Sequence, residues 1–134
     1  VSDVSPLAQI PGISAIMTCS TQLKDLSPLY PVAERITYLD VCNTPFRDFG
    51  ELKRFKNLKT LKLWGMPLGS LEILTDLQQL ETLDLTGATY ESLTPLEKLP
   101  ALKKLDMIGN KVNEGEIESL RKKLPGLEIV TQSD

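Results

Sequence analysis

A fixed period of about 22 residues runs through most of this 134-residue chain and constrains its fold more than any other feature. The repeats begin at Ile13, Ile36, Leu58, Leu80 and Leu102, at intervals of 23, 22, 22 and 22 residues. Apolar residues follow each of these positions three, usually five, and ten places later. A unit of this length cannot bury its apolar face alone, so neighbouring repeats must stack on one continuous core.

The two halves of each repeat predict different local structures. In the first half, apolar residues at alternate positions indicate a short strand, although Thr18 interrupts this pattern in the first repeat. The second half carries short apolar patterns with proline, as in Ser27-Pro28-Leu29 and Thr94-Pro95-Leu96. These segments favour 3₁₀ or extended chain over a full α-helix. Stacked strands would form a parallel sheet.

Windows such as ITYLDVCNTPF from Ile36 and LKKLDMIGNKV from Leu102 resemble the L-x-x-L-x-L-x-x-N-x-L pattern of the leucine-rich repeat family. The short period and the D-L-S-P-L segment at 25–29 are most similar to bacterial internalin-type repeats. The resemblance implies a right-handed, curved α/β solenoid with its parallel sheet on the concave face and 3₁₀ or extended segments on the convex side.

The asparagine column of that pattern is mostly lost in this chain. It is occupied by Thr21, Thr44, Met66, Ala88 and Asn110. We therefore expect a hydrogen-bonded asparagine in the last repeat only, with threonine hydroxyls partly substituting elsewhere.

We interpret residues 1–134 as a single leucine-rich repeat domain, with a partial repeat over 1–12, five repeats over 13–112 and a C-terminal cap over 113–134. Val4-Ser5-Pro6-Leu7 matches the second half of a repeat and lacks a preceding strand. Because the first residue is Val1 and not methionine, we expect the chain to be a fragment of a longer protein, continuing upstream with a further strand or a capping element.

The C-terminal segment breaks the period and reads as a capping helix from Asn113 to Leu124. Asn113 and Glu116 have the spacing of a capping box. Ile117, Leu120 and Leu124 would face the last repeat, and Pro125-Gly126 would end the helix. A final short strand is expected at Leu127, Ile129 and Val130. Such a cap covers the end of the core.

Composition argues against several classes of function. The chain has no histidine, which removes the usual general base and the commonest zinc ligand. Its net charge of −3 disfavours nucleic-acid binding, and no apolar run approaches the ~18 residues of a membrane span. We expect no catalytic residues, no metal site, no cofactor and no membrane insertion.

Two cysteines, Cys19 and Cys42, occupy equivalent positions in adjacent repeats. They would lie close enough to bridge, but the torsion that a disulfide requires is seldom met between parallel neighbours. We expect free thiols.

The residues between the apolar anchors would point away from the core, and this face carries the candidate binding site. Trp64 is the single tryptophan, and tryptophan is enriched at binding hot spots. We predict that it forms an exposed apolar patch with Tyr38, Cys42, Met66 and Ile108. Trp64 packing over its neighbours, or contacting a part of the protein outside this chain, are the alternatives.

A charged column is predicted beside this patch, made by Asp40, Lys62, Asp84 and Asp106. We expect Lys62 to form cross-strand ion pairs with Asp40 and Asp84. Asp84 and Asp106 would be unfavourable like-charged neighbours unless Lys104 or a cationic group of a partner relieves them.

The resemblance implies a non-catalytic protein–protein interaction module that uses the concave face, with Trp64, Tyr38, Asp40, Lys62, Asp84, Asp106 and Ile108 as the expected contact residues. An alternative is a substrate-recognition or accessory domain of a larger enzyme or secreted bacterial effector. The partner would be a protein. Cytoplasmic, surface-bound and injected proteins are all compatible with the sequence, and free thiols weakly favour a reducing compartment.

Overall fold

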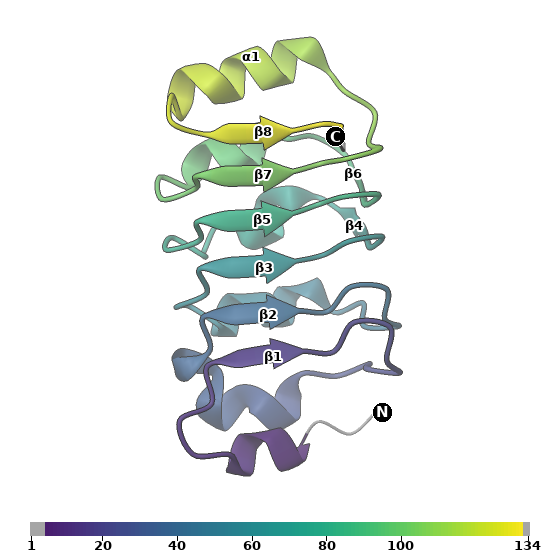
Figure 1. Ribbon diagram of the computed structural model, residues 1–134, viewed down its shortest axis with the longest axis vertical. Coiled ribbons are helices and arrows are strands. Elements are labelled where there is room, and N and C mark those ends of the chain that lie inside the picture. Colours follow the sequence, from purple (N-terminus) through teal and green to yellow (C-terminus); the bar gives the residue numbers. More distant parts are fainter. Residues whose placement is uncertain (1–4, 133–134) are drawn as a thin grey trace.

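A computed structural model describes residues 5–132 and shows a stack of short strands backed by a layer of short helices (Figure 1). The main sheet is parallel and contains, in order, β1 (Ala15–Met17), β2 (Tyr38–Asp40), β3 (Thr60–Lys62), β5 (Thr82–Asp84), β7 (Lys104–Asp106) and β8 (Glu128–Val130). A second sheet of two strands pairs β4 (Pro67–Gly69) with β6 (Thr89–Tyr90). The predicted parallel sheet of stacked repeats is thereby confirmed.

The layer behind the main sheet consists of 3₁₀ helices, as the proline-containing segments predict (Figure 1). Their bounds are η1 (Ser5–Gln9), η2 (Ser27–Arg35), η3 (Phe49–Arg54), η4 (Leu71–Leu74) and η5 (Thr94–Lys98). The segment η1 lies within residues 1–12, the predicted partial repeat, and residues 1–4 of that stretch lie outside the described residues.

The strands stack in exact register, one rung from each repeat. Leu39 pairs with Leu61, Leu61 with Leu83, and Leu83 with Leu105. These central residues are fully buried in one apolar cluster that extends from Ile16 to Leu127. The residues on either side of the central one point outward and pair in the same register, so they form two outward columns along the sheet.

A left-handed backbone turn follows each of the first five strands of the main sheet. The turn residue is Gly65, Gly87 or Gly109 in the last three repeats, with φ between +67° and +78°. Ser20 (φ +59°) and Asn43 (φ +51°) take its place in the first two. Glycine adopts this conformation without strain and asparagine does so readily, so the turn selects these residues.

The asparagine ladder is reduced to its last rung, as predicted. The Asn110 side chain donates to the Leu85 carbonyl (2.7 Å) and accepts from the Gly87 N–H (2.7 Å), which ties two repeats together. Thr44 donates to the Val41 carbonyl (2.8 Å) of its own repeat. The hydroxyls of Thr21 and Thr44, the two threonines of the asparagine column, therefore bond within their own turns and do not bridge neighbouring repeats.

The C-terminal cap forms where the sequence predicts it. Helix α1 (Glu114–Lys123) begins after Asn113, whose side chain accepts from the Glu116 N–H (3.2 Å), and it buries Ile117, Leu120 and the following Leu124 against the last repeat. The Glu116 carboxylate does not complete the capping box, because it accepts from Ser92 and Leu93 of the preceding repeat. Among the described residues, no helix is long and apolar enough to cross a membrane.

Candidate functional site

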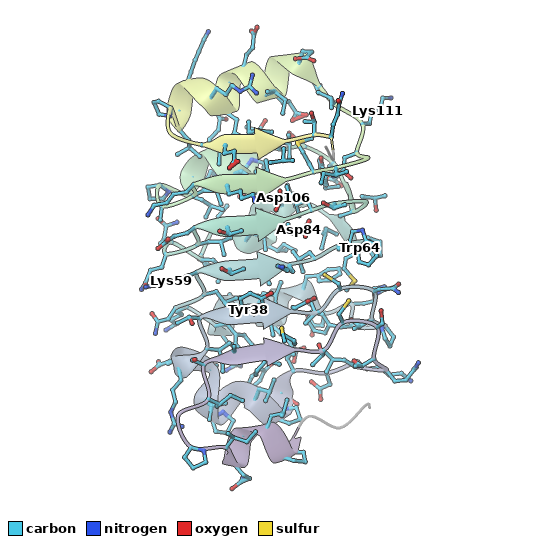
Figure 2. All side chains as sticks on the ribbon, viewed as in Figure 1. Tyr38, Lys59, Trp64, Asp84, Asp106 and Lys111 are labelled. Atoms are coloured by element: carbon cyan, nitrogen blue, oxygen red, sulfur yellow. The ribbon has the colours of Figure 1, made fainter. Side chains whose placement is uncertain are left out.

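The face of the main sheet that points away from the 3₁₀ layer carries five of the seven predicted contact residues, Tyr38, Asp40, Lys62, Asp84 and Asp106, whereas Trp64 and Ile108 lie in the turns that follow the strands. We call it the open face and define it by the outward residues of β1, β2, β3, β5 and β7, which are Ala15, Met17, Tyr38, Asp40, Thr60, Lys62, Thr82, Asp84, Lys104 and Asp106. Figure 2 shows Tyr38, Asp84 and Asp106 on this face. The register places Asp40 beside Lys62, Lys62 beside Asp84, and Asp84 beside Asp106.

The ion pairs predicted for Lys62 are wrong. Within the described residues, ion pairs join Lys98 to Glu72, Lys103 to Glu81 and Lys104 to Asp106, and none involves Lys62. The Lys62 ammonium instead lies over the Tyr38 ring, 5.6 Å from its centroid, in a cation–π contact.

The two aspartates beside Lys62 are held by their own backbone. Asp40 Oδ1 accepts from the Cys42 N–H (3.0 Å), and Asp84 Oδ1 accepts from the Thr86 N–H (2.9 Å). An aspartate that bonds the amide two residues ahead stabilises the turn that follows it. The sequence signal for this role was an aspartate at the end of a strand pattern, directly before the turn.

The surroundings of Lys62 and Asp106 on the open face raise the pKa of both groups. The pKa of Lys62 is raised above its ordinary value, chiefly by the interaction with the Tyr38 side chain. Burial opposes this shift, and the negative charges of Asp40 and Asp84 add to it. Burial, together with the charges of Asp84 and Glu128, raises the pKa of Asp106, while Lys104 partly offsets the shift. The predicted like-charge neighbour of Asp84 is thus partly relieved by Lys104, whose Nζ lies 4.0 Å from Asp106 Oδ1.

The raised pKa of Asp106 predicts that Asp106→Asn stabilises the protein at neutral pH. A carboxyl whose pKa is higher in the folded than in the unfolded state is penalised once it ionises, so stability falls as pH rises through that range. The variant lacks this penalty. Because Lys104–Asp106 is a weak surface pair, we expect a net gain of up to about 0.5 kcal/mol. Urea denaturation should show a higher free energy of unfolding for the variant at neutral pH, and no difference between the two proteins at a pH low enough to protonate Asp106. A lower free energy of unfolding for the variant at neutral pH would contradict the prediction.

Trp64 lies at the edge of the open face and not at its centre. It follows β3 in the turn, at the carboxyl end of the strands (Figure 2), and is 47% exposed. Its indole lies over Gly87 of the next repeat, where a Cβ would meet the indole nitrogen at 3.6 Å. Asn43, Trp64, Gly65 and Gly87 line a shallow hollow here. We call this hollow and its indole the Trp64 ledge.

The apolar patch predicted around Trp64 is smaller than expected, because Cys42 and Met66 are buried. Met66 packs in the core at the position that asparagine holds in the last repeat. Cys42 turns inward, and its Sγ accepts the backbone N–H of Trp64 (3.2 Å). Tyr38 and Ile108 are half-buried. The predictions that Cys42 and Met66 form part of an exposed patch are therefore wrong.

Both cysteines are free, as expected, but their surroundings differ. Cys19 is exposed, whereas Cys42 is buried. Burial above all, and then Asp40, raises the pKa of the Cys42 thiol. The two sulfur atoms and a carboxylate oxygen of Asp40 lie within 4.8 Å of one another. The equivalent positions of Cys19 and Cys42 in adjacent repeats predict that the two cysteines lie close together, whereas the proximity of Asp40 was not predicted.

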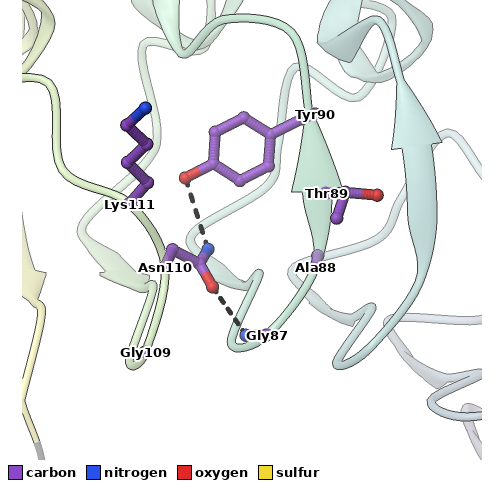
Figure 3. A pocket seen from close by; sticks show the side chains of 7 residues that line it. All are labelled: Gly87, Ala88, Thr89, Tyr90, Gly109, Asn110 and Lys111. Carbon is purple, nitrogen blue, oxygen red and sulfur yellow. Dashed lines mark hydrogen bonds between the residues drawn. The ribbon is translucent and has the colours of Figure 1, made fainter.

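A second hollow lies between the last two turns and is shown in Figure 3. Asn110 crosses it and donates to the Tyr90 hydroxyl (3.3 Å) while accepting from the Gly87 N–H. The hydrogen bonds of Asn110 across this hollow join neighbouring repeats and so stabilise the stack of turns.

No protein-family model matches the chain, and no curated protein matches it. Solved structures do. An internalin of Listeria monocytogenes (inlF) superposes with a TM-score of 0.79 at 20% identity, covering 100% of this chain and 39% of the internalin chain. Internalin C2 of the same species gives a TM-score of 0.78 at 25% identity, covering 99% and 57%. A leucine-rich repeat protein of Leptospira interrogans gives 0.75 at 22% identity, covering 96% and 34%. The chain thus spans less than two thirds of each.

Proposed function

We propose that this chain, which has the leucine-rich repeat fold of the internalin type, is a non-catalytic module that binds another protein through its open face and the adjoining Trp64 ledge. The contact residues would be Trp64, Tyr38, Asp40, Lys62, Asp84, Asp106 and Ile108. The observation that carries the proposal is the half-exposed indole of the single tryptophan, held at the edge of a rigid sheet.

The rigid placement of Trp64 suits it for binding. Its backbone N–H is bonded to Cys42, its carbonyl accepts from the Asn43 N–H (3.2 Å), and its indole rests on Gly87. A partner that covers this side chain would remove apolar surface from water while ordering little additional structure. Preorganised aromatic side chains of this kind commonly dominate binding energy.

The charges of the open face supply specificity. Lys62, Asp84, Asp106 and Lys104 lie on adjacent strands, so a partner meets a fixed pattern of positive and negative groups. Complementary charges chiefly raise association rates and exclude wrong partners. The Trp64 ledge would then contribute most of the affinity, and the charged rows would set the orientation.

The absence of histidine from the sequence and the roles of the aspartates support a non-catalytic function. Asp40 and Asp84 are engaged in turn hydrogen bonds. Asp106 is paired with a lysine on an open sheet surface. Carboxylates that act in acid–base catalysis are generally placed in a cleft that excludes water.

The proposal is tested by labelling Trp64 with 5-fluorotryptophan and recording ¹⁹F spectra. Because the chain has one tryptophan, it gives one resonance, and an unlabelled protein captured on the immobilised chain adds none. We expect that resonance to shift or broaden when the purified captured protein is added. An unchanged resonance during complex formation, verified by co-elution, would place binding elsewhere on the molecule.

A further inference from the structure

We propose that Cys19, Asp40 and Cys42 form a binding site for one thiophilic divalent cation of the Zn²⁺ class. Each residue offers one ligand atom, two sulfurs and one carboxylate oxygen, and all three lie within 4.8 Å of one another. Zn²⁺ is bound by such atoms at about 2.0–2.3 Å, which puts the donors of one tetrahedral ion about 3–4 Å apart. Small side-chain adjustments would bring these donors to that spacing.

The stacking of the first two repeats brings these residues together. Met17 pairs with Asp40 in the sheet, so the turns that follow β1 and β2 lie side by side. The Ser20 N–H donates to the Cys42 carbonyl (2.9 Å), which fixes one turn against the other. The three ligand side chains therefore lie on turns whose backbone is already fixed, so binding of a cation requires little ordering of the chain.

Two of the three ligands are also oriented by neighbouring hydrogen bonds. The Trp64 N–H donates to Cys42 Sγ (3.2 Å), and the Cys42 N–H donates to Asp40 Oδ1 (3.0 Å). Bonds of this kind orient metal ligands and tune their affinity. The cation would replace the thiol protons, as metal binding to cysteine does.

The third ligand leaves the site open on one side. Cys19 is exposed, and its Sγ lies 3.7 Å from the Ser20 hydroxyl. Three protein ligands with a free fourth position are typical of zinc sites that retain a water or accept an external ligand. A bound cation would join the first repeat to the second, next to the Trp64 ledge.

The later repeats lack this arrangement, although they share its backbone. At the two positions equivalent to Asp40 and Cys42 they carry Lys62 and Trp64, Asp84 and Thr86, and Asp106 and Ile108. The thiols are thus confined to the first two repeats. No metal site was expected from the sequence, because it contains no histidine and only two cysteines. The third ligand, Asp40, is brought to the two cysteines by the stacking of the repeats.

The test uses the full chain under reducing conditions, with Zn²⁺ followed by calorimetry and Cd²⁺ followed by its thiolate charge-transfer absorption. We expect one ion per chain. Cys19→Ser should weaken binding by at least about 10-fold, because loss of a ligand should cost no less than the 10–100-fold that loss of an outer hydrogen-bond partner costs. Cys42→Ser should act similarly and Asp40→Asn more mildly.

Asp84→Asn is the matched control. Asp84 makes the same turn hydrogen bond as Asp40 in a repeat without thiols, so this variant removes the turn bond and no ligand. Its metal affinity should equal that of the unmodified chain. The proposal would be overturned if Cys19→Ser bound the metal ion as tightly as the unmodified chain, or if one ion were shared by two chains. It would also be overturned if a Cys19–Cys42 disulfide formed in place of the metal complex. Because Cys19 is exposed, we expect its replacement to leave the fold intact. Circular dichroism of the variant checks this.

Discussion

Replacing Leu83 by alanine is expected to lower the free energy of unfolding by about 2–5 kcal/mol, the usual cost of truncating a fully buried leucine. Leu83 is 0% exposed at the centre of β5, and its register partners are Leu61 and Leu105. Strands on both sides hold the backbone in place, so the structure cannot collapse into the cavity without loss of register. Denaturant unfolding followed by circular dichroism measures the change.

Thr82→Ala is the control for this prediction. Thr82 is the preceding residue of the same strand and belongs to the open face, so its truncation leaves the core filled. We expect a change within about 0.5 kcal/mol, as for most substitutions on a surface. Equal destabilisation by the two variants would show that the inward and outward residues have been assigned incorrectly.

The fold could be predicted from the sequence because stacking depends on the repeat period. Leucines at a fixed period of 22 residues place one strand in each unit, and equal units stack in register. The cap could also be predicted, since Asn113, Ile117 and Leu120 follow helix rules that do not depend on distant contacts. The contact of Glu116 with Ser92 and Leu93 could not, because it joins residues of different units.

The candidate site was predicted less completely, because it depends on the turns as well as the strands. Strand alternation places Tyr38, Lys62 and Asp84 correctly on the open face. It does not determine where Cys42 and Trp64 point, although they hold equivalent positions. Cys42 is buried and Trp64 is exposed, because each turn has its own hydrogen bonds and packing.

The error at Lys62 has a similar origin. Opposite charges on adjacent strands predict ion pairs when side chains are free to meet. Asp40 and Asp84 are instead engaged by backbone N–H groups, and the Tyr38 ring offers the ammonium another contact. The alternation of charges was a correct observation, but turn hydrogen bonds compete for the same carboxylates.

Trp64→Ala is expected to leave the fold intact and to weaken partner binding by about 2 kcal/mol or more, which corresponds to about 30-fold in Kd. The indole is half-exposed and rests on Gly87, so its removal opens no cavity in the core. A partner that covers it would lose a large, preorganised apolar contact.

Ile10→Ala is the matched control for this prediction. Ile10 is 46% exposed, close to the 47% of Trp64, but it directly follows η1 in the N-terminal part of the chain and lies outside the open face. Its truncation removes exposed apolar surface without touching the proposed site. Its Kd for the partner should equal that of the unmodified chain.

The most direct test of binding through this face is the Kd of the captured partner for the unmodified chain, Trp64→Ala and Ile10→Ala, measured by surface plasmon resonance on folded proteins. We predict a loss of about 30-fold or more for Trp64→Ala and no change for Ile10→Ala. Equal Kd values for all three proteins would contradict the account.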